Sequence, residues 1–440
     1  MKGRVFDLQQ VVPHDVSGIM QRLVEFGHEC WLVGGAVRDL LLGLEPKDWD
    51  LAATATTDQL LRLFPRVVPT GVRHGTVQVR TRERGVEVTS CHPPGAGGIL
   101  EDLGRRDFTL NAMAIAWPCG EILDPHDGEQ DLKADRLRAV GDARLRFRED
   151  PLRTLRACRF VGVYGFSLEP ATFSALKEEA DGLRRVARER IREEMFRLIL
   201  GPHVKDAFGW MWRGGVLRHV LPELTDRCSE PMRPVDSLAV FRRAVRRVYF
   251  CPYRLEVRLA ALLQDVAEAG KTAPELAAVE TPGATTGITA AVGVLERWRS
   301  SQARSRHVLT LIENRLPGRT KEWSEADARR ILARVGPGLV RDLLDLATAD
   351  RRARDDPADS IDSVQNLRTM IEDQLDSRAP TRIQDLAIDG ADIMRILGIA
   401  QGPRVGEILK RILDRVLEEP GRNERDELLE LVRAEYDKTF

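Results

Sequence analysis

The segment from Trp31 to Ala52 (WLVGGAVRDLLLGLEPKDWDLA) constrains the fold of this chain more than any other feature. An apolar run ends in Gly34 and Gly35, a helical pattern follows at once, and a second apolar run carries Asp48 and Asp50. Glycines lack a Cβ atom and let the backbone approach a bulky anion, which the free N–H groups of a helix start can then bind. The segment therefore predicts a strand–helix–strand unit that contacts phosphate.

The carboxylates of Asp48 and Asp50 are two positions apart in a strand predicted over Asp48 to Ala52. Side chains at i and i+2 of a strand point to the same side, so we expect both carboxylates to project together, with Trp49 opposite. Close carboxylates repel unless a cation joins them, and Mg²⁺ favours one or two carboxylates plus phosphate oxygens. A lone Asp-x-Asp is common on surfaces, but after the two glycines it predicts a two-metal Mg²⁺ site.

The periodicity of the apolar residues changes near Asp150. Before it, alternating runs such as Thr76 to Thr81 and Gly85 to Thr89 predict strands among helices. After it, apolar residues recur at helical spacing only. The expected class is α+β, with an N-terminal α/β head at 1–140, followed by an all-helical neck at 141–200, body at 201–320 and tail at 321–440.

Composition excludes several classes of protein. With 43% apolar and 31% charged residues the chain can bury a sizeable core, and no apolar run approaches the roughly 18 residues that span a bilayer. The start, MKGRVFDLQQVV, lacks the apolar stretch of a secretory signal, so we expect a cytoplasmic protein without membrane contact. The six cysteines include no Cys-x-x-Cys pair, which argues against a zinc knuckle and a disulfide scaffold. Nothing in the sequence indicates a stable protein partner.

Arginine clusters are hidden by the net charge of −1. They lie at Arg136 to Phe160, Leu183 to Arg197 and Phe241 to Phe250. The planar guanidinium suits phosphate and base edges, which favours a nucleic-acid surface. Solvated helix faces with ion pairs at i,i+4 explain the clusters equally well, so composition leaves both interpretations open.

Several motifs in order resemble the class II (bacterial-type) tRNA nucleotidyltransferases, meaning the CCA-adding enzymes, and the related poly(A) polymerases. The motifs span roughly residues 28–200 and read GGAVRD, DWDLAATA, GVRHGTVQV, VEVT, RRDFTLNAMA, DPHDGEQDLKADRLRAVG, REDPLRTLRACRF and RERIREEMFRLI. The resemblance implies a nucleotidyltransferase head that transfers nucleotides from CTP or ATP to the 3′ end of tRNA and releases pyrophosphate. It also implies that the helical parts hold the tRNA acceptor arm.

The resemblance assigns roles to particular residues. Asp48 and Asp50 would be catalytic and would hold the metal ions, with Glu87 as a third acid. Glu149, Asp150 and Arg153 would select the base, because a carboxylate can accept from the amine that cytosine and adenine carry beside a ring acceptor. The nucleotide would contact the following residues: Gly34, Gly35, Arg38, Arg106, Asp107, Asn111, Asp150, Arg153, Arg156 and Arg159.

Three of these assignments have plainer alternatives, and a histidine in the same motifs has one as well. Asp150 and Arg153 are three positions apart, so on one helix they could instead form an N-cap with an ion pair. Asp107 could cap the helix that it precedes, and Glu87 could be an exposed strand residue. His74 beside Gly75 is more readily explained as a structural histidine than as a ligand or base.

Two segments depart from the family pattern. Ser90 to Gly104 (SCHPPGAGGILEDLG) is shorter than the corresponding family loop and lacks its TFR arginine, which resembles the CC-adding subgroup and favours addition of C from CTP. Complete CCA addition, A addition, poly(A) addition and a non-catalytic RNA-binding relative remain alternatives. Gln264 stands before Asp265 where some relatives have the His-Asp pair of a phosphohydrolase, so we expect a core helix there and no such activity.

Overall fold

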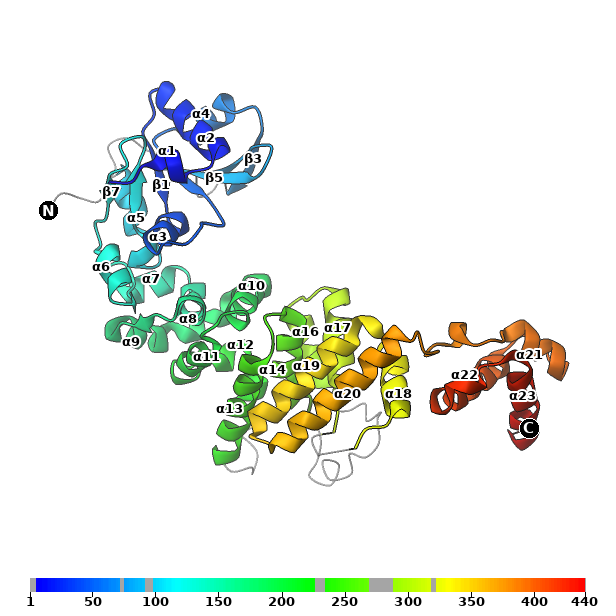
Figure 1. Cartoon of the computed structure of the whole chain (residues 1–440). Coiled ribbons are helices and arrows are strands. Elements are labelled where there is room, and N and C mark those ends of the chain that lie inside the picture. The colour runs from blue at the N-terminus through cyan, green and yellow to red at the C-terminus, as the bar shows by residue number, and fades with distance from the viewer. Residues whose placement is uncertain are drawn as a thin grey trace. The chain divides into compact units, whose positions relative to one another are not determined.

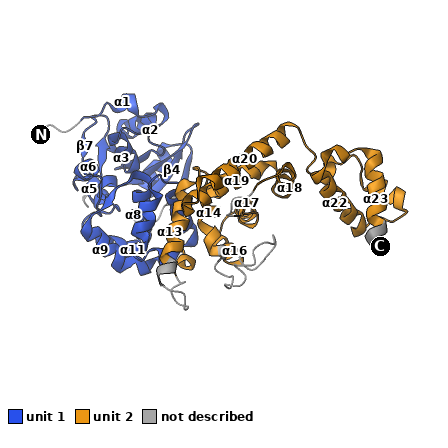
Figure 2. Cartoon of the chain, turned by 60° about the horizontal axis from the view of Figure 1, so that its bottom comes forward, with its two compact units in different colours: residues 1–220 blue, residues 221–440 orange. Residues whose placement is uncertain are grey.

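The computed structural model describes residues 5–71, 75–91, 98–225, 234–268, 288–317 and 322–439. The chain divides into two compact units, residues 1–220 and residues 221–440 (Figure 2). The predicted α+β class is confirmed, since a mixed sheet near the N-terminus is followed by a helical remainder (Figure 1). The finer division into head, neck, body and tail stays a prediction.

A seven-stranded sheet forms the head, in the order β3-β4-β5-β2-β1-β6-β7. Strands β2 and β5 are parallel, and the other neighbouring pairs are antiparallel. The strands are β1 (Cys30–Val33), β2 (Asp50–Ala53), β3 (Val67–Gly71), β4 (Thr76–Arg80), β5 (Gly85–Ser90), β6 (Ala114–Ala116) and β7 (Ile122–Leu123).

Alternation of apolar residues places β4 and β5 in this sheet. Val77 and Val79 are buried on β4, and Val86 and Val88 are buried on β5, while Glu87 between them is exposed. The central strand β1 is buried along its whole length, which fits a strand covered on both faces. One core cluster of the head therefore includes residues of β1, β2 and β6.

The helices of the head surround this sheet and continue into the rest of unit 1. Between Arg106 and β6 the chain forms only the short 3-10 helix η2 (Thr109–Asn111). The helices of the head are α1 (Leu8–Val11), α2 (His14–Glu25), α3 (Gly35–Leu41), α4 (Thr57–Leu63), α5 (Gly98–Gly104) and α6 (Gly128–Lys133).

Helix α8 (Leu152–Tyr164) is the centre of the helical part of unit 1, since α10 (Arg188–Ile199) and α11 (Val204–Arg213) pack against it. A two-residue strand β9 (Ser167–Leu168) pairs in parallel with β8 (Arg136–Leu137), so the expectation of helices only beyond Asp150 is wrong at this point. The remaining helices of unit 1 are α7 (Ala143–Glu149), α9 (Pro170–Glu179), η3 (Ala180–Arg185) and α12 (Leu217–Val220).

Unit 2 is helical throughout its described residues. Helices α13, α14, α17, α19 and α20 pack pairwise along one another, and α21, α22 and α23 share a separate core cluster (Figure 1). The helices are η4 (Pro222–Leu224), α13 (Pro234–Phe250), α14 (Leu255–Glu268), α16 (Ile288–Arg297), α17 (Gln302–Glu313), α18 (Glu325–Val335), α19 (Pro337–Arg354), α20 (Ala358–Asp376), η6 (Ile383–Asp385), α21 (Gly390–Leu397), α22 (Pro403–Glu418), η7 (Pro420–Arg422) and α23 (Arg425–Thr439).

Local signals explain several helix starts. Thr56 and Gln59 form a reciprocal capping box at α4, and Ser324 and Asp327 form another at α18, each worth about 1 kcal/mol. Asp142 accepts the N–H groups of the first turn of α7. None of the helices in the described part of the chain is both long and apolar enough to cross a membrane.

Candidate active site

A cleft of about 420 Å³ in unit 1 gathers most of the residues that the sequence singled out. Residues from the β1–α3 junction, β2, β4, β5, α5, η2 and α8 line it. Those predicted from the sequence are Gly34, Gly35, Asp50, Arg106, Asp107, Asn111, Asp150, Arg153 and Arg156. The structure places the other predicted residues outside this lining: Arg38, Asp48, Glu87, Glu149 and Arg159.

Asp50 is the first residue of β2, and its strand partner on the parallel strand β5 is Glu87. Burial and, after it, the charges of Glu87 and Asp48 together raise the pKa of Asp50 to about 6, against the opposing effect of the Arg106 guanidinium. Negative charge is therefore crowded at this end of the sheet. Such crowding fits a carboxylate that meets a cation when the site is in use.

Asp48 lies before β2 and is exposed, so the strand predicted over Asp48 to Ala52 begins two residues late. The physical reason is that β1 ends at Val33, the ladder partner of Asp50, because the chain turns at Gly34. Asp48 has no strand partner there, and the argument from alternating strand side chains does not apply to it. The negative charge of Asp48 still raises the pKa of Asp50, so the two carboxylates are close enough to interact electrostatically.

The fit to Mg²⁺ rests on two carboxylates. Within the described ranges, acidic, histidine and cysteine side chains form no cluster of three that could hold a metal ion, so Glu87 does not complete a preformed site. Mg²⁺ is commonly bound by one or two carboxylates together with substrate phosphates. Asp48 and Asp50 fit that pattern.

Gly34 precedes α3 as its N-cap residue and has a positive φ of 72°, which suits glycine. A Cβ at this position would lie 2.7 Å from Nη1 of Arg106 and 3.8 Å from Oδ2 of Asp50. The absence of a side chain therefore lets a guanidinium and a carboxylate approach the same point of the backbone. The predicted role of Gly34 in binding nucleotide stays a prediction, but its need for close approach is now explained.

Asp107 is buried, and it is tied to the helical part of unit 1. Its Oδ1 accepts from the Phe108 N–H at 2.8 Å and from the side chain of Asn111 at 3.0 Å, and its Oδ2 accepts from Nε of Arg156 at 2.9 Å. Burial alone would raise the pKa of Asp107, but Arg156 and these hydrogen bonds lower it to about 2. Asp107 is thus a fixed anion at the cleft and does not cap a regular helix.

Arg38 is almost fully buried, although the sequence suggested that it reaches phosphate. Its guanidinium donates to Asn111 Oδ1 at 2.7 Å and to the Tyr164 hydroxyl at 2.6 Å, and it also binds the neighbouring Asp39. It lies 4.6 Å over the ring of Tyr164. In this structure Arg38 therefore fixes the side chain of Asn111 by a hydrogen bond. A contact of Arg38 with phosphate stays a prediction.

Arg159 also points away from the cleft. Its Nε lies 2.5 Å from Oε2 of Glu194, and its guanidinium lies 4.2 Å from the centre of the Phe160 ring. Glu194 is 3.4 Å from Nη1 of Arg156 as well, so one buried carboxylate on α10 holds two arginines of α8. Arg156 lines the cleft, whereas Arg159 supports the helix that carries it.

Asp150 and Arg153 line the cleft, but they do not share a helix face as predicted. Asp150 is extended between α7 and α8, where its Oδ1 accepts from the Leu152 N–H at 3.2 Å and its Oδ2 pairs with Nη2 of Arg190 at 2.7 Å. Arg153 starts α8 and donates to the carbonyl of Arg105 at 2.8 Å. The suggested ion pair between Asp150 and Arg153 is replaced by the pair with Arg190.

Sequence reasoning missed several cleft residues. Thr76 and Thr89 are hydrogen-bonded across β4 and β5 at 3.1 Å, and Asp102 and Arg105 lie on or next to α5. The spacing of Asp102 and Arg106 at i,i+4 is the signal that would have found one of them. His74 and residues 92–97 of the departing loop lie outside the described residues.

Three family models match the chain. Residues 30–138 match the poly A polymerase head domain, residues 165–228 match the probable RNA and SrmB binding site of polymerase A, and residues 285–432 match domain 2 of tRNA nucleotidyltransferases. The similarity to the tRNA nucleotidyltransferases therefore extends well beyond residue 200, where the last of the sequence motifs lies.

Curated relatives include two bacterial CCA-adding enzymes. The one from Anoxybacillus flavithermus is 38% identical over 252 residues, which cover 53% of this chain and 63% of the relative. The one from a Geobacillus species is 39% identical over 226 residues, which cover 48% and 55% respectively. The chain thus spans between half and two thirds of the length of the curated relatives that it matches.

Solved structures agree over nearly the whole chain. The CCA-adding enzyme of Bacillus stearothermophilus in complex with CTP has a TM-score of 0.74 and 27% identity, covering 96% of this chain and 97% of that one. The Thermotoga maritima CCA-adding enzyme complexed with tRNA has a TM-score of 0.63 at 20% identity, which shows the fold alone.

The sheet, the turn at Gly34 and the acidic end of β2 define a protein built on the poly A polymerase head. As the order of its motifs predicted, the chain carries segments that match the poly A polymerase head domain and domain 2 of tRNA nucleotidyltransferases, and it is similar to CCA-adding enzymes in sequence and in fold.

Proposed function

We propose that this chain is a tRNA 3′-terminal nucleotidyltransferase that adds C from CTP and releases pyrophosphate, with the acceptor arm of tRNA as its second substrate. The observation that supports it is one cleft lined by both Asp50 and the pair Asp150 and Arg153. One cleft thus contains a carboxylate, Asp50, that could bind the metal ions of nucleotidyl transfer. It also contains an acceptor, Asp150, and a donor, Arg153, that could bind a base. The sequence relatives named as CCA-adding enzymes support the same reaction class.

The chain's own residues would mainly position the reactants, which is the larger part of catalysis in nucleotidyl transfer. The triphosphate would contact Arg106 and the backbone at Gly34 and Gly35. Asp107 and Asn111, fixed by Arg156 and Arg38, would hold the ribose. The 3′-hydroxyl of the RNA then attacks the α-phosphate, and the bond between the α- and β-phosphates breaks to release pyrophosphate.

Asp48 and Asp50 would hold Mg²⁺ in this scheme. The bound ions would activate the hydroxyl and neutralise charge on the triphosphate. The half-buried position of Asp50, paired in the sheet with Glu87, supports this assignment, because carboxylates that crowd together favour a cation.

Base choice would fall to Asp150 and Arg153. On their Watson–Crick edges cytosine and adenine carry an exocyclic amine next to a ring nitrogen acceptor, whereas uracil and guanine carry a carbonyl oxygen next to a ring N–H at the same positions. A carboxylate that accepts from the amine and a guanidinium that donates to the acceptor would therefore select CTP and ATP without a nucleic-acid template.

The short segment Ser90 to Gly104 supports C addition as the finer proposal. Its described end folds as helix α5, whose Leu103 is fully buried in a core cluster of the head. A short segment that is anchored at one end offers fewer residues that could move to change the shape of the pocket for a second base. Complete CCA addition is the second candidate, because the curated relatives carry that name.

Three tRNA substrates test both candidates: one lacking the terminal CCA, one ending in C and one ending in CC. Each is incubated with Mg²⁺ and CTP, ATP or both, and the products are resolved at single nucleotides. Two C additions without A support the CC proposal, and C plus A supports the complete enzyme. Addition of A alone to the CC-ended substrate, or long A tails on unrelated RNA, would contradict both. No incorporation at all would favour the non-catalytic RNA-binding relative.

A further inference from the structure

Helix α5, at the end of the segment that departs from the family pattern, carries two acids that pair at i,i+4 with arginines directly after the helix. Glu101 pairs with Arg105, and Asp102 pairs with Arg106. The two pairs differ in exposure, since the side chain of Arg105 is 73% exposed and that of Arg106 only 21%. The second pair therefore lies against the protein, and both of its members line the cleft.

Asp102 engages one edge of the Arg106 guanidinium. Its Oδ2 accepts from Nε at 3.0 Å and from Nη2 at 2.9 Å. The third nitrogen, Nη1, lies 3.4 Å from the carbonyl oxygen of Asn111 and close to the bare backbone of Gly34. A guanidinium held along one edge can still donate from the opposite side.

Arg106 lies near Asp50 without pairing with it. The Arg106 charge lowers the pKa of Asp50, yet the ion pairs found among the described residues join Arg106 to Asp102 only. An arginine freed from Asp102 would have a second carboxylate within its reach. It would then neutralise the acid that we assign to the metal ions and withdraw a donor from the triphosphate.

We infer that Asp102 is a positioning residue for nucleotide binding, which holds Arg106 on the cleft wall and keeps it from closing onto Asp50. This inference rests on the proposed function. Leu103, buried in the core beside Asp102, fixes the helix that carries the carboxylate. The departing segment is thus a rigid support of the cleft at its C-terminal end.

The test measures the affinity for CTP with Mg²⁺ and without tRNA, by titration calorimetry, for the full chain. We expect Asp102→Ala to weaken CTP binding about tenfold, as for coupled groups in one network. Asp102→Asn should lose less, because its amide oxygen still accepts a hydrogen bond. Glu129→Ala is the matched control, since it breaks the exposed i,i+4 pair of Glu129 with Lys133 on α6 and should leave the affinity unchanged.

A double-mutant cycle shows whether Asp102 acts through Arg106. In an Arg106→Ala background, Asp102→Ala should cause no further loss of CTP affinity. In steady state, the KM for CTP should rise while the KM for tRNA stays constant, which a general loss of structure would not produce.

Two results would overturn the inference: unchanged CTP affinity in both Asp102 variants, or an equal loss with and without Arg106. If Asp102→Ala fails to fold by circular dichroism, Asp102→Asn decides by the same criteria. A wild-type chain that neither binds CTP nor extends tRNA would refute the proposed function itself, which is a different outcome.

Discussion

Arginine and aspartate side chains meet in both units, but with opposite access to solvent. In unit 1, Asp50, Asp102 and Arg106 line an open cleft. In unit 2, Arg247 is 0% exposed and contacts two buried acids, with Nε 2.6 Å from Asp350 and Nη1 3.2 Å from Asp265. Buried charges are tolerated when every one has a protein partner, whereas charges that line a cleft keep positions open for a ligand.

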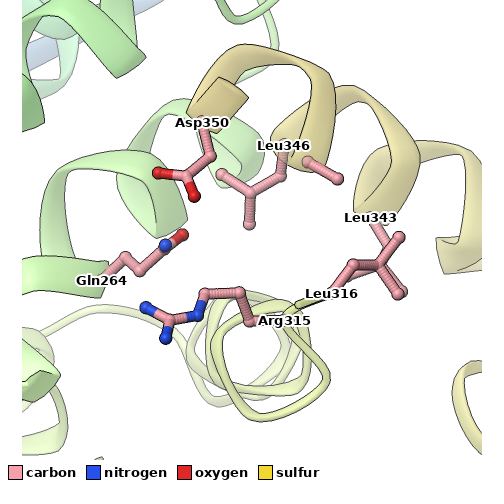
Figure 3. A pocket seen from close by; sticks show the side chains of 7 residues that line it. Gln264, Arg315, Leu316, Leu343, Leu346 and Asp350 are labelled. Atoms are coloured by element: carbon pink, nitrogen blue, oxygen red, sulfur yellow. The ribbon is translucent and has the colours of Figure 1, made fainter. Parts of the chain in front are cut away.

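A pocket that includes Asp350 of this buried cluster differs from the cleft of unit 1 in the same way, because it is closed to solvent-sized molecules. Gln264, Arg315 and Asp350 face one another, and Leu316, Leu343 and Leu346 lie opposite (Figure 3). The pocket admits no water-sized sphere, unlike the cleft of unit 1 with about 420 Å³. The segment around Gln264 forms the core helix α14, as predicted, and the absence of phosphohydrolase activity stays a prediction.

The largest effect is expected at the cleft. Asp50→Asn removes the half-buried negative charge that would meet the metal ions, and should lower kcat for C incorporation about a thousandfold, equivalent to several kcal/mol. Asp58→Asn, an exposed acid in the first turn of α4, should leave kcat unchanged. Incorporation into tRNA measured at saturating CTP would decide, and near-wild-type turnover of Asp50→Asn would remove the cleft from the catalytic scheme.

The next effect concerns stability in unit 2. Arg247→Met leaves Asp265 and Asp350 buried with a lost partner, and should lower the free energy of unfolding by about 3–5 kcal/mol. Its neighbour Arg246 pairs with Asp355 at the surface, so Arg246→Met should cost less than about 1 kcal/mol. Urea unfolding of both variants makes the comparison. Equal losses would mean that burial does not distinguish the two pairs.

A smaller effect depends on pH. The pKa of Asp107 is lowered to about 2, so its ionised form stabilises the fold above the unfolded value near 4, and that stabilisation is lost as the pH falls from about 4 to about 2. A shift of this size contributes about 2–3 kcal/mol. Asp107→Asn should therefore be less stable than wild type at pH 6, and the difference should shrink towards pH 2 in urea unfolding. A difference independent of pH would contradict the ion pair with Arg156.

The smallest effect is a gain. Both polar atoms of the buried Gln264 side chain lack a hydrogen-bond partner. Gln264→Leu removes this unpaired amide from a pocket that also contains three leucines, and should raise the free energy of unfolding by about 1 kcal/mol. Gln365→Leu on the exposed face of α20 is the control and should gain nothing. Destabilisation by Gln264→Leu would mean that the pocket has a polar role.

The sequence predicted local structure well and long-range partners poorly. The strand–helix–strand unit around Gly34, the strands β4 and β5 and the helical remainder were read from periodicity. Asp48 was misplaced because the length of a strand depends on its ladder partners, which periodicity does not contain. Asp150 was misplaced because the chain bends at the Asp150–Pro151 step, and its partner Arg190 is 40 residues away.

By itself the sequence determined which chemical groups the head carries and in what order, because spacing along a strand or helix fixes neighbours up to four residues away. It therefore contained the glycine turn, the acids Asp48 and Asp50 and the spacing that pairs Asp102 with Arg106. Only the tertiary structure decided which distant groups meet. Asp107 and Arg156 are 49 residues apart and Arg247 and Asp350 are 103 apart, and such pairs form only where packing of the sheet and helices brings them together. Packing also decided which charges were sealed in unit 2 and which were left open at the cleft.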